Sequence, residues 1–195
     1  MVEKKRRLTR EDWTAAALDA LAEGGLAAVA IEPLAARLGA TKGSAYWHFP
    51  NREALLVATL ERWENEHTEA VIAATEAESE PVAKLRLLYG SAIVHASGNL
   101  IVLALLGAVN DPVVAPFVRR VNRRWLSYLA GLYRDMGLRT KQARRRALLA
   151  YSAYLGLAQL AVSSPESVPS TKAARIAYVE EAVASLGART GVATA

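Results

Sequence analysis

Residues 30–53, AIEPLAARLGATKGSAYWHFPNRE, are the stretch that decides the fold of this chain. Its first part places apolar residues at the spacing i, i+3, i+4 and i+7, which is one face of a short helix; they are Ile31, Leu34, Ala35 and Leu38. Pro33 falls in the first turn of that helix, where a missing N–H is harmless. Gly39 then permits a tight turn. The stretch therefore predicts a helix, a turn and a second helix, with the motif at about residues 30–49.

The second helix is predicted over residues 41–49, and its composition is unusual for a scaffold. Thr41 can cap it, while Ala45 and Phe49 can face inward. Gly43 in its first turn costs about 0.5–1 kcal/mol relative to alanine, which makes sense if another backbone approaches closely. Packing is one explanation for the aromatic residues; exposure beside cationic groups favours contact with base edges and phosphates instead. The outward-facing residues are Lys42, Ser44, Tyr46, Trp47 and His48.

Before this motif the sequence predicts one more helix, from about residue 9 or 10 to Glu23. Thr9 can cap it, with Asp12 three residues later in the first turn. Trp13 belongs to the apolar stripe and is expected in the core. Gly24 and Gly25 are expected to end the helix, because glycine tolerates the left-handed conformation.

A basic cluster precedes this helix and comprises Lys4, Lys5, Arg6, Arg7 and Arg10. A solvated, frayed terminus would account for such a cluster. Next to a helix-turn-helix, the cluster is also suited to be an arm that contacts phosphates or the minor groove.

After the motif the chain reads as helices throughout. Pro50 stops the second helix, Asn51 can cap the next one, and a long helix of roughly 40 Å is predicted over residues 52–78. Further helices are predicted at 81–97, 100–109, 112–136, 140–162 and 171–186. No strand pattern competes, so the expected fold is all-α with about nine helices. Residues 1–52 are expected to form the DNA-binding domain and 53–195 a regulatory and dimerisation domain.

The composition limits the functions available to the chain. Its 195 residues are 52% hydrophobic, which is enough to bury a sizeable core, and they carry a net charge of +5, which suits a polyanionic partner. The absence of cysteine excludes disulfides and thiolate metal sites. Apolar runs at 100–109 and 147–162 invite a membrane interpretation, but the first is too short and the second contains polar residues. We expect a cytoplasmic protein without a membrane span.

Residues 30–53 resemble the TetR/AcrR family of bacterial transcriptional regulators. The match includes Leu34-Ala35, Gly39, His48-Phe49, Arg52-Glu53 and Leu55, and it extends over about residues 9–60. Ala30 and Ala45 depart from the family pattern, so Glu32 or water must compensate for the missing helix cap at Ala30. The resemblance implies a DNA contact surface made of Thr41, Lys42, Gly43, Ser44, Tyr46, Trp47 and His48, with Arg52 on a phosphate.

The same resemblance implies a homodimer formed through the last two helices. Small residues at 150–161 and an apolar stripe at 176–186 fit that role. A dimer would present two recognition helices about 34–36 Å apart to a palindromic double-stranded operator.

The resemblance also implies an unidentified small-molecule effector that binds between helices of the second half and releases DNA. Core or interface packing is the alternative for each candidate contact residue. These candidates are Trp63, His67, Tyr89, His95, Asn99, Asn110, Trp125, Tyr128 and Tyr154. A second basic feature comprises Arg119, Arg120, Arg123, Arg124, Arg144, Arg145 and Arg146, and it is explained by solvated helix faces or, alternatively, by an anionic effector or extra DNA contacts.

Three classes of function are considered for this sequence: a DNA-binding regulator, a helical binding or scaffold protein, and an enzyme. We expect a ligand-responsive DNA-binding regulator, most simply a repressor. The alternative is a helical small-molecule-binding or scaffold protein without operator binding. An enzyme is not expected, because no nucleophile–base spacing or phosphate-binding loop is present. Glu64 and His67 are spaced as metal ligands can be, but further ligands are missing, so neither a metal nor a cofactor is expected.

Overall fold

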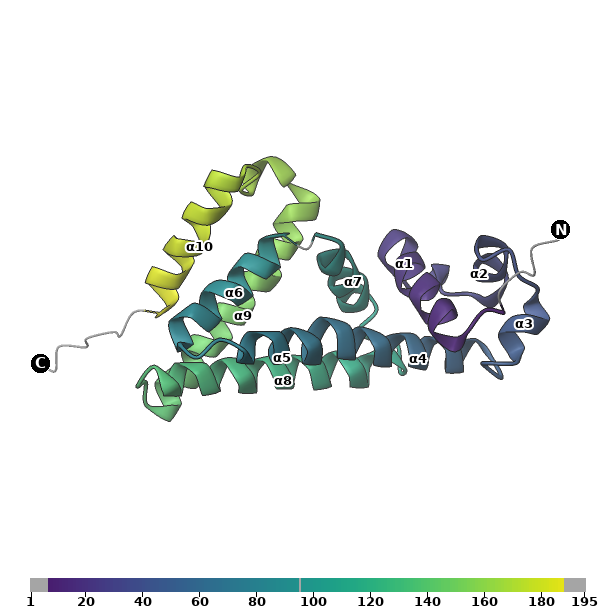
Figure 1. The fold of residues 1–195 in the computed structure, drawn as a ribbon, viewed down its shortest axis with the longest axis horizontal. Coiled ribbons are helices and arrows are strands. Elements are labelled where there is room, and N and C mark those ends of the chain that lie inside the picture. The colour runs from purple at the N-terminus through teal and green to yellow at the C-terminus, as the bar shows by residue number, and fades with distance from the viewer. Residues whose placement is uncertain (1–6, 95, 188–195) are drawn as a thin grey trace, which may run out of the picture. The chain divides into compact units, whose positions relative to one another are not determined.

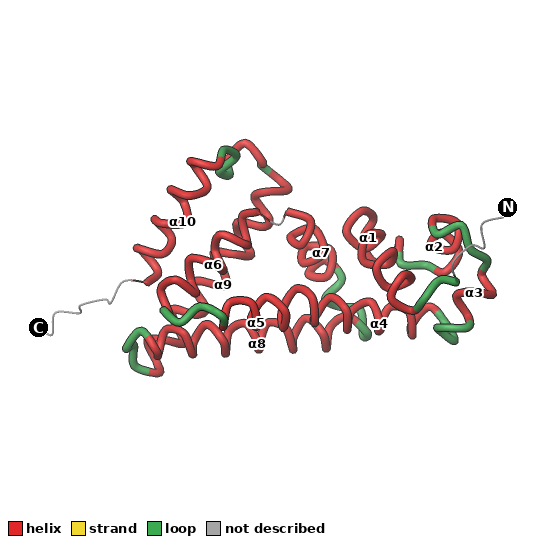
Figure 2. The backbone as a smooth tube through the Cα atoms, viewed as in Figure 1, coloured by secondary structure: helices red, strands yellow, loops and turns green. Residues whose placement is uncertain are grey.

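The computed structural model describes residues 7–94 and 96–187, and for residues 96–99 it describes the backbone alone. Every regular element in this part of the chain is helical (Figure 2), which confirms the expected all-α fold. The α-helices, labelled in Figure 1, are α1 (Arg10–Ala28), α2 (Ile31–Arg37), α3 (Lys42–Tyr46), α4 (Arg52–Glu64), α5 (Ala70–Glu76), α6 (Pro81–Val94), α7 (Ala96–Gly107), α8 (Val114–Asp135), α9 (Thr140–Ser163) and α10 (Lys172–Gly187).

The chain divides into two compact units. The N-terminal unit consists of Met1–Glu66 and Leu100–Val118, and the C-terminal unit of His67–Asn99 and Arg119–Ala195. The N-terminal unit contains α1 to α4, in which α1 packs against α2 and α4 and α2 packs against α3. The boundary expected at residue 52 from the sequence stays a prediction.

Helix α1 begins as expected and ends later than expected. The Thr9 hydroxyl accepts a hydrogen bond from the Asp12 amide at 3.3 Å, and the Asp12 carboxylate accepts one from the Thr9 amide at 2.8 Å, so the capping box is confirmed. Gly25 adopts a left-handed φ of 66° and interrupts the helix, but helical turns resume and continue to Ala28. The regular helix is therefore broken at the glycines, as predicted, and the helical turn between Gly25 and Ala28 was not predicted.

The core of the N-terminal unit is aromatic and aliphatic. Trp13 and Leu21 of α1 are fully buried, as are Leu55 and Leu60 of α4, and Phe49 is 1% exposed. Each such leucine contributes about 1.5–3 kcal/mol on burial. The expectation that Trp13 is a core residue is confirmed.

Helix α4 is fixed at its start by two side chains. The Asn51 carboxamide oxygen accepts a hydrogen bond from the Ala54 amide at 2.8 Å and caps the helix, as predicted. The guanidinium of Arg52 donates to the carbonyls of Val29 and Leu26, both at 2.7 Å, just after and within the last turn of α1. The bond to Val29 supplies a donor to a carbonyl just past the helix end, and the bond to Leu26 adds to the hydrogen bond that this carbonyl accepts from the Val29 amide. They also join α4 to α1.

The long helix predicted over residues 52–78 is not a uniform α-helix. Helix α4 passes into a π-helical turn, η1 (Asn65–Glu69), and continues as α5, which ends at Glu76. Thr59 and Thr75 donate their hydroxyls to the carbonyl four residues earlier, each at 2.8 Å. Thr68, inside η1, is 1% exposed and its hydroxyl has no hydrogen-bond partner. The π turn widens the helix and so removes the local acceptor that the other two threonines use.

In the C-terminal unit, α6 packs against α5, α9 and α10. Helices α5 and α8 lie side by side (Figure 1). Polar side chains of α8 form hydrogen bonds with carboxylates of η1 and α5. The Arg124 guanidinium donates to both carboxylate oxygens of Glu69, with distances from 2.9 Å, and the Tyr128 hydroxyl donates to Glu76 at 2.6 Å. Lys84 donates to the same Glu76 carboxylate at 2.6 Å.

Among the described helices, none combines the length and the apolar composition that crossing a membrane requires. Within the same residues, no group of three or more His, Cys, Asp or Glu side chains is arranged to hold a metal ion. Glu64 and His67 therefore gain no further ligand from the described part of the fold.

Candidate nucleic-acid interface

Helices α2 and α3 form the helix-turn-helix that the sequence predicts. Ile31, Leu34 and Ala35 face the core with 6%, 1% and 4% exposure. Gly39 takes a left-handed φ of 58°, and the Ala40 amide donates to the Ala35 carbonyl at 2.8 Å, which closes the turn. The tight turn thus depends on a glycine at position 39.

The recognition helix α3 is shorter than expected. It covers Lys42–Tyr46 instead of residues 41–49, and Trp47 and His48 follow it as a turn before Pro50. The Thr41 hydroxyl accepts a hydrogen bond from the Ser44 amide at 3.3 Å, so the predicted cap is present. Ala45 is fully buried and fixes which side of α3 faces the core. The opposite side is therefore presented to solvent.

Two aromatic side chains on that side are exposed. Trp47 is 79% exposed and Tyr46 is 54% exposed, so core packing does not explain them. The guanidinium of Arg7 lies 5.7 Å from the centre of the Trp47 ring, within the range of a cation–π contact. Exposed aromatic groups beside cations are suited to contact bases and sugar–phosphate chains.

Lys42 forms an ion pair with Glu32 of α2. Both side chains are more than half exposed. Ala30, the residue at the start of α2, makes no side-chain cap, and the Glu32 carboxylate that was expected to compensate is paired with Lys42 instead. This pairing of Glu32 was not predicted. The only indication of it in the sequence is an acidic residue in a helix next to a predicted basic surface.

His48 lies differently from the other predicted DNA contacts. Its Nε2 is 3.1 Å from the Leu8 carbonyl oxygen, and since a carbonyl only accepts, Nε2 carries the hydrogen and donates it. The side chain is half-buried, and its ring is tilted against Phe49 at 6.2 Å between centroids. Arg52 likewise uses two of its N–H groups within the protein, on Leu26 and Val29. Contacts of both side chains with DNA stay predictions.

Four of the predicted effector contacts lie in or against one hydrophobic core in the C-terminal unit; they are Tyr89, Trp125, Tyr128 and Tyr154. Tyr89 is 8% exposed, burial raises the pKa of its hydroxyl, and this hydroxyl interacts with that of Tyr133. Tyr128 donates to Glu76, which gives it a structural role. Trp125 contacts Tyr128 edge-on, and Tyr154 stacks on Tyr151.

The remaining predicted effector contacts are more scattered. Trp63 is buried in α4 with its indole N–H unpartnered, and His67 is half-buried in η1. Asn110 is exposed in a turn. His95 lies outside the described residues, and of Asn99 only the backbone, within α7, is described.

Two buried hydroxyls were not anticipated from the sequence. Tyr133 is fully buried in the same core as Tyr89, and its hydroxyl interacts with that of Tyr89, whereas the buried hydroxyl of Thr68 has no hydrogen-bond partner. Burial raises the pKa of the Tyr133 hydroxyl and keeps it protonated. Nothing in a helical stripe distinguishes such a tyrosine from ordinary packing, so no sequence signal could have found it.

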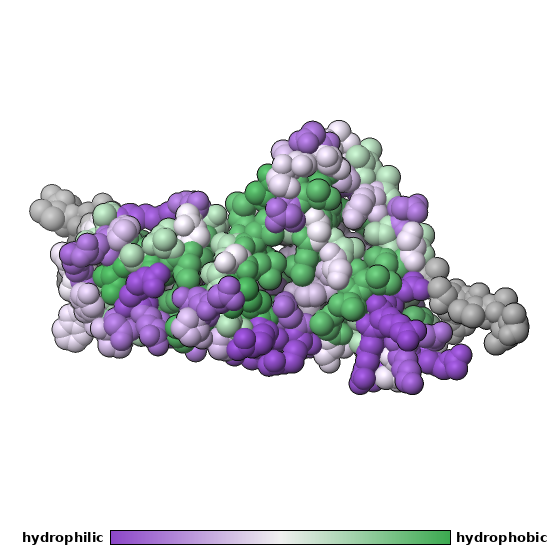
Figure 3. Space-filling view, turned by 180° about the vertical axis from the view of Figure 1, so that it is seen from behind, coloured by the Kyte–Doolittle hydropathy of each residue, from purple (hydrophilic) through white to green (hydrophobic). Residues whose placement is uncertain are grey.

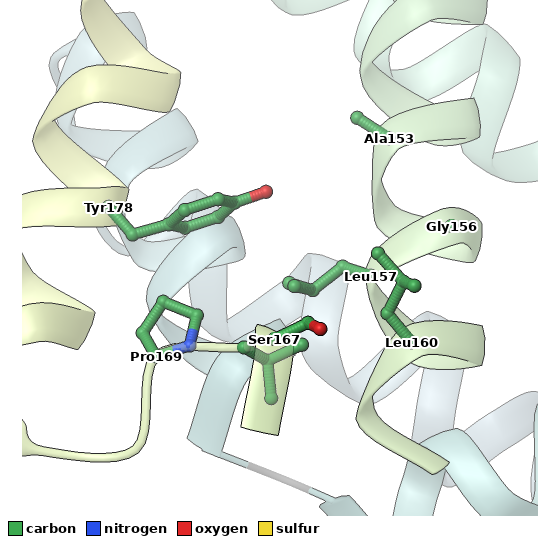
Figure 4. A pocket seen from close by; sticks show the side chains of 8 residues that line it. Ala153, Gly156, Leu157, Leu160, Ser167, Pro169 and Tyr178 are labelled. Atoms are coloured by element: carbon green, nitrogen blue, oxygen red, sulfur yellow. The ribbon is translucent and has the colours of Figure 1, made fainter. Parts of the chain in front are cut away.

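A groove of about 570 Å³ opens between α9 and α10. Figure 4 shows the Tyr178 side chain projecting toward α9 across the groove, with Leu157 and Leu160 on the opposite side. None of the predicted effector contacts lines it; its lining residues are Ala153, Gly156, Leu157, Leu160, Ser167, Val168, Pro169 and Tyr178.

Apolar side chains also reach the surface on the last two helices. Leu148, Leu149 and Leu160 of α9 are 45–59% exposed, and Ile176 of α10 is 54% exposed. Figure 3 shows one face of the molecule, on which green hydrophobic residues gather among purple hydrophilic ones. Large exposed leucines close together are typical of an association surface.

Members of the second basic feature have structural partners. Arg124 pairs with Glu69, and Arg146 donates to the carbonyls of Ser185 and Leu186 at 3.1 and 2.8 Å, at the end of α10. Arg124 is thus paired with an acidic neighbour, and Arg146 is bonded to backbone carbonyls. Arg119, Arg123, Arg144 and Arg145 are exposed.

Comparison with known proteins gives one family model. Residues 14–59 match the model described as bacterial regulatory proteins, tetR family. No curated protein sequence matches the chain.

Solved structures share its fold across nearly the whole length. A transcriptional regulator from Rhodococcus sp. Rha1 is 22% identical with a TM-score of 0.75, covering 92% of this chain and 94% of its own. A TetR-family transcriptional regulator from Agrobacterium tumefaciens is 20% identical with a TM-score of 0.71, covering 88% and 93%. The regulator FadR from Bacillus subtilis, in complex with stearoyl-CoA, is 15% identical with a TM-score of 0.68, covering 91% and 97%.

Proposed function

Since this chain belongs to the TetR family of bacterial regulatory proteins, we propose that it is a ligand-responsive, DNA-binding transcriptional regulator. The exposed surface of α3 and of the turn after it supports this proposal most directly. Trp47 is 79% exposed beside the guanidinium of Arg7, and a large apolar ring that water surrounds in this way is typical of a surface that a partner covers. A regulator that binds chromosomal DNA would act in the cytoplasm, and not as an enzyme.

The DNA contacts in this proposal come from α3 and its flanks. The backbone N–H groups at the start of α3 suit a phosphate. A Cβ at position 43 would meet only the Thr41 hydroxyl, at 3.7 Å, so the surface over Gly43 is open to a sugar–phosphate chain. Lys42, Tyr46 and Trp47 project from the solvent side. The proposed set is Thr41, Lys42, Gly43, Ser44, Tyr46, Trp47 and His48, with Arg52 on a phosphate.

The first experiment selects duplexes from random-sequence DNA with the full chain and measures affinity for the selected duplex. Lys42→Ala combined with Trp47→Ala should abolish sequence-preferring binding and leave the oligomeric state unchanged. The control combines Lys141→Ala with Leu87→Ala, which are exposed positions on α9 and α6. Failure to select any sequence, at any salt concentration, would refute a DNA-binding function and favour a helical small-molecule-binding protein.

The proposal includes a homodimer formed by α9 and α10, the last two helices. The exposed leucines of α9, Ile176 of α10 and the groove between the two helices support it, because a partner surface would cover them. A dimer would bind a palindromic operator with two half-sites about one DNA turn apart, and binding would repress the regulated gene.

The effector in this proposal binds to the hydrophobic core of the C-terminal unit. That core presents aromatic walls and the buried hydroxyls of Tyr89 and Tyr133, a combination suited to an apolar or aromatic molecule with a hydrogen-bonding group. Its binding would release DNA, with a coupling of about 1–3 kcal/mol, or about 5–150-fold in affinity. The test titrates a panel of apolar and aromatic metabolites and drugs into the operator-bound protein. No release by any of them would count against an effector of this class.

A further inference from the structure

The last turn of α1 and the connection to α2 occupy residues 26–30, directly after a break in the helix. Gly25 has a left-handed φ of 66°, so regular α-helical geometry stops one residue before Leu26. The last turn also carries no basic side chain that would complement the negative end of the helix dipole. Carbonyl groups of this segment therefore gain from a cation that another helix supplies.

The start of α2 has no side-chain cap. Ala30 takes the extended N-cap conformation, with φ −137° and ψ 143°, but its methyl group cannot accept a hydrogen bond from an amide. Pro33, the third residue of the helix, has no N–H, so a capping side chain at position 30 would take the amide of Glu32. Local interactions therefore hold the first turn of α2 less firmly than those of α1, α3 and α4, which begin at capped residues.

Arg52, in the first turn of α4, bonds to both parts of this segment. Its Nε donates to the Val29 carbonyl and its Nη2 to the Leu26 carbonyl, each at 2.7 Å. These nitrogens are two donors on one edge of a planar, rigid guanidinium group, so their bonds fix the two carbonyls relative to each other. Val29 is itself fully buried and directly precedes Ala30. The chain that enters α2 is thus held from α4.

Helix α2 has seven residues, and its position determines that of the recognition helix. It packs against α3, and its Glu32 pairs with Lys42 of that helix. The other end of α2 is tied to α1, because the Arg37 guanidinium donates to both carboxylate oxygens of Glu23, at 2.7 and 3.0 Å. Since one end is tied in this way, release of the start would let α2 tilt and would move α3 with it.

We propose that Arg52 is a positioning residue for DNA recognition, which holds the start of α2 in place of the side-chain cap that Ala30 lacks. It acts through the carbonyls of Leu26 and Val29. This inference rests on the proposed DNA-binding function, and it is separate from the phosphate contact proposed for Arg52, because Nη1 takes no part in the two bonds. A lysine at this position would carry the charge without the pair of rigidly spaced donors.

The first test is whether a cap at position 30 makes Arg52 dispensable. Affinity for the duplex selected by the unaltered protein is measured for Arg52→Met, Ala30→Ser and their combination, at a temperature where all of them are folded. Arg52→Met removes both donors and should weaken binding about fivefold or more, because only the fraction of molecules with α2 in place binds tightly. Ala30→Ser alone should change the affinity by less than about twofold, and in the combination it should recover most of the loss.

Two variants control for the lost charge and for the added hydroxyl. Arg123→Met removes an exposed arginine from α8, and Ala36→Ser adds a hydroxyl to an exposed position of α2 beyond its first turn. Arg123→Met should bind as the unaltered protein does, and Ala36→Ser should recover nothing in the Arg52→Met background. An equal effect of Ala30→Ser in both backgrounds overturns the positioning role. A loss that Ala30→Ser leaves untouched, with a salt dependence of log K weaker by about 0.9, identifies a phosphate contact alone and also overturns it.

The second test needs no DNA. The Leu34 amide donates to the Ala30 carbonyl at 3.2 Å, so its hydrogen exchange reports opening of the first turn of α2. In the DNA-free full chain, Arg52→Met should speed this exchange about fivefold or more, Ala30→Ser should slow it in the combined variant, and Arg123→Met should leave it unchanged. Unchanged exchange at Leu34 in Arg52→Met would overturn the inference.

The proposed function and this inference fail in different experiments. If the unaltered protein selects no duplex, the proposed function fails, whatever the exchange at Leu34 shows. If it selects one and Ala30→Ser gives no selective recovery, only the inference fails. Thermal unfolding monitored by circular dichroism verifies that each variant is folded at the temperature of the binding measurement.

Discussion

Glu32 of α2 pairs with Lys42 of α3 across the helix-turn-helix. DNA would have to compete with this carboxylate for Lys42, and Glu32 would also repel nearby phosphates. Surface ion pairs contribute little to stability, so the pair is not needed for folding.

We therefore expect Glu32→Gln to raise affinity for the selected duplex several-fold at low salt without lowering the unfolding temperature. Glu61→Gln, which removes an exposed carboxylate from α4, is the control. Fluorescence anisotropy at two salt concentrations measures the effect, which should shrink as salt increases. Weaker DNA binding by Glu32→Gln would mean that the ion pair orients Lys42 for DNA.

At this scale, local interactions were predictable and those between helices were not. The caps by Thr9, Thr41 and Asn51 follow from a side chain meeting an amide three residues later, so the sequence is enough. Glu32 to Lys42 and His48 to Leu8 join residues 10 and 40 positions apart, and only the fold brings them together.

The π-helical turn η1 is the feature by which α4 and α5 differ from one continuous α-helix. A π turn holds more residues than an α turn, so η1 accommodates one residue in excess of regular α-helical packing. Asn65 is exposed at its start.

Deletion of Asn65 should therefore convert α4, η1 and α5 into a continuous α-helix in nearly the same register. We expect the variant to fold, with helix content by circular dichroism unchanged within error. Deletion of Glu61, an exposed residue inside α4, is the matched comparison and should destabilise the protein by several kcal/mol, because it turns the buried Trp63 away from its site. Equal destabilisation by both deletions would show that η1 does not absorb a residue.

Helices were predictable as elements because their apolar periodicity and their Pro and Gly boundaries are local. Two features departed from the prediction, and each has a physical reason. Gly25 kinks α1 without ending it, and η1 interrupts the long helix in a stretch where no glycine or proline marks it. The effector residues were the least predictable, since buried hydroxyls such as Tyr133 look like any core position.

At the scale of the whole molecule, Glu76 connects three helices of the C-terminal unit, since its carboxylate accepts hydrogen bonds from Lys84 and Tyr128. These bonds, with Lys84 first, lower the pKa of Glu76 below its ordinary value of 4.5. A carboxylate with a lowered folded-state pKa contributes stability above the unfolded-state value, and that contribution is lost as the pH falls through the folded-state pKa.

The urea midpoint of unfolding should accordingly decrease when the pH is taken from well above 4.5 to well below it. Glu76→Gln should be less stable at the higher pH and should show a smaller decrease. Glu166→Gln, at an exposed position in a short 3-10 turn, should retain the full decrease. An identical pH dependence in Glu76→Gln and the unaltered protein would exclude Glu76 as a contributor.

The proposed dimer can be disrupted at one exposed leucine of α9. Leu149 is 59% exposed, and placing a charge there would oppose burial of the surface that the dimer is expected to cover. Leu149→Glu should yield a folded monomer by sedimentation and reduce affinity for a two-half-site duplex to that for a single half-site. Leu87→Glu, at a residue 51% exposed on α6, should keep the oligomeric state and the duplex affinity of the unaltered protein. A dimeric Leu149→Glu variant would show that the dimer interface does not include Leu149.

The two hydrogen bonds of Arg52 have a mechanical consequence. They link the first turn of α4 to the carbonyls of Leu26 and Val29, where α1 ends and the chain enters α2. Helix α4 is thus not a lever attached to the DNA-binding helices by chain connectivity alone. A torque applied to its first turn therefore acts directly on the junction of α1 and α2 through the Arg52 guanidinium, as well as along the chain through α3.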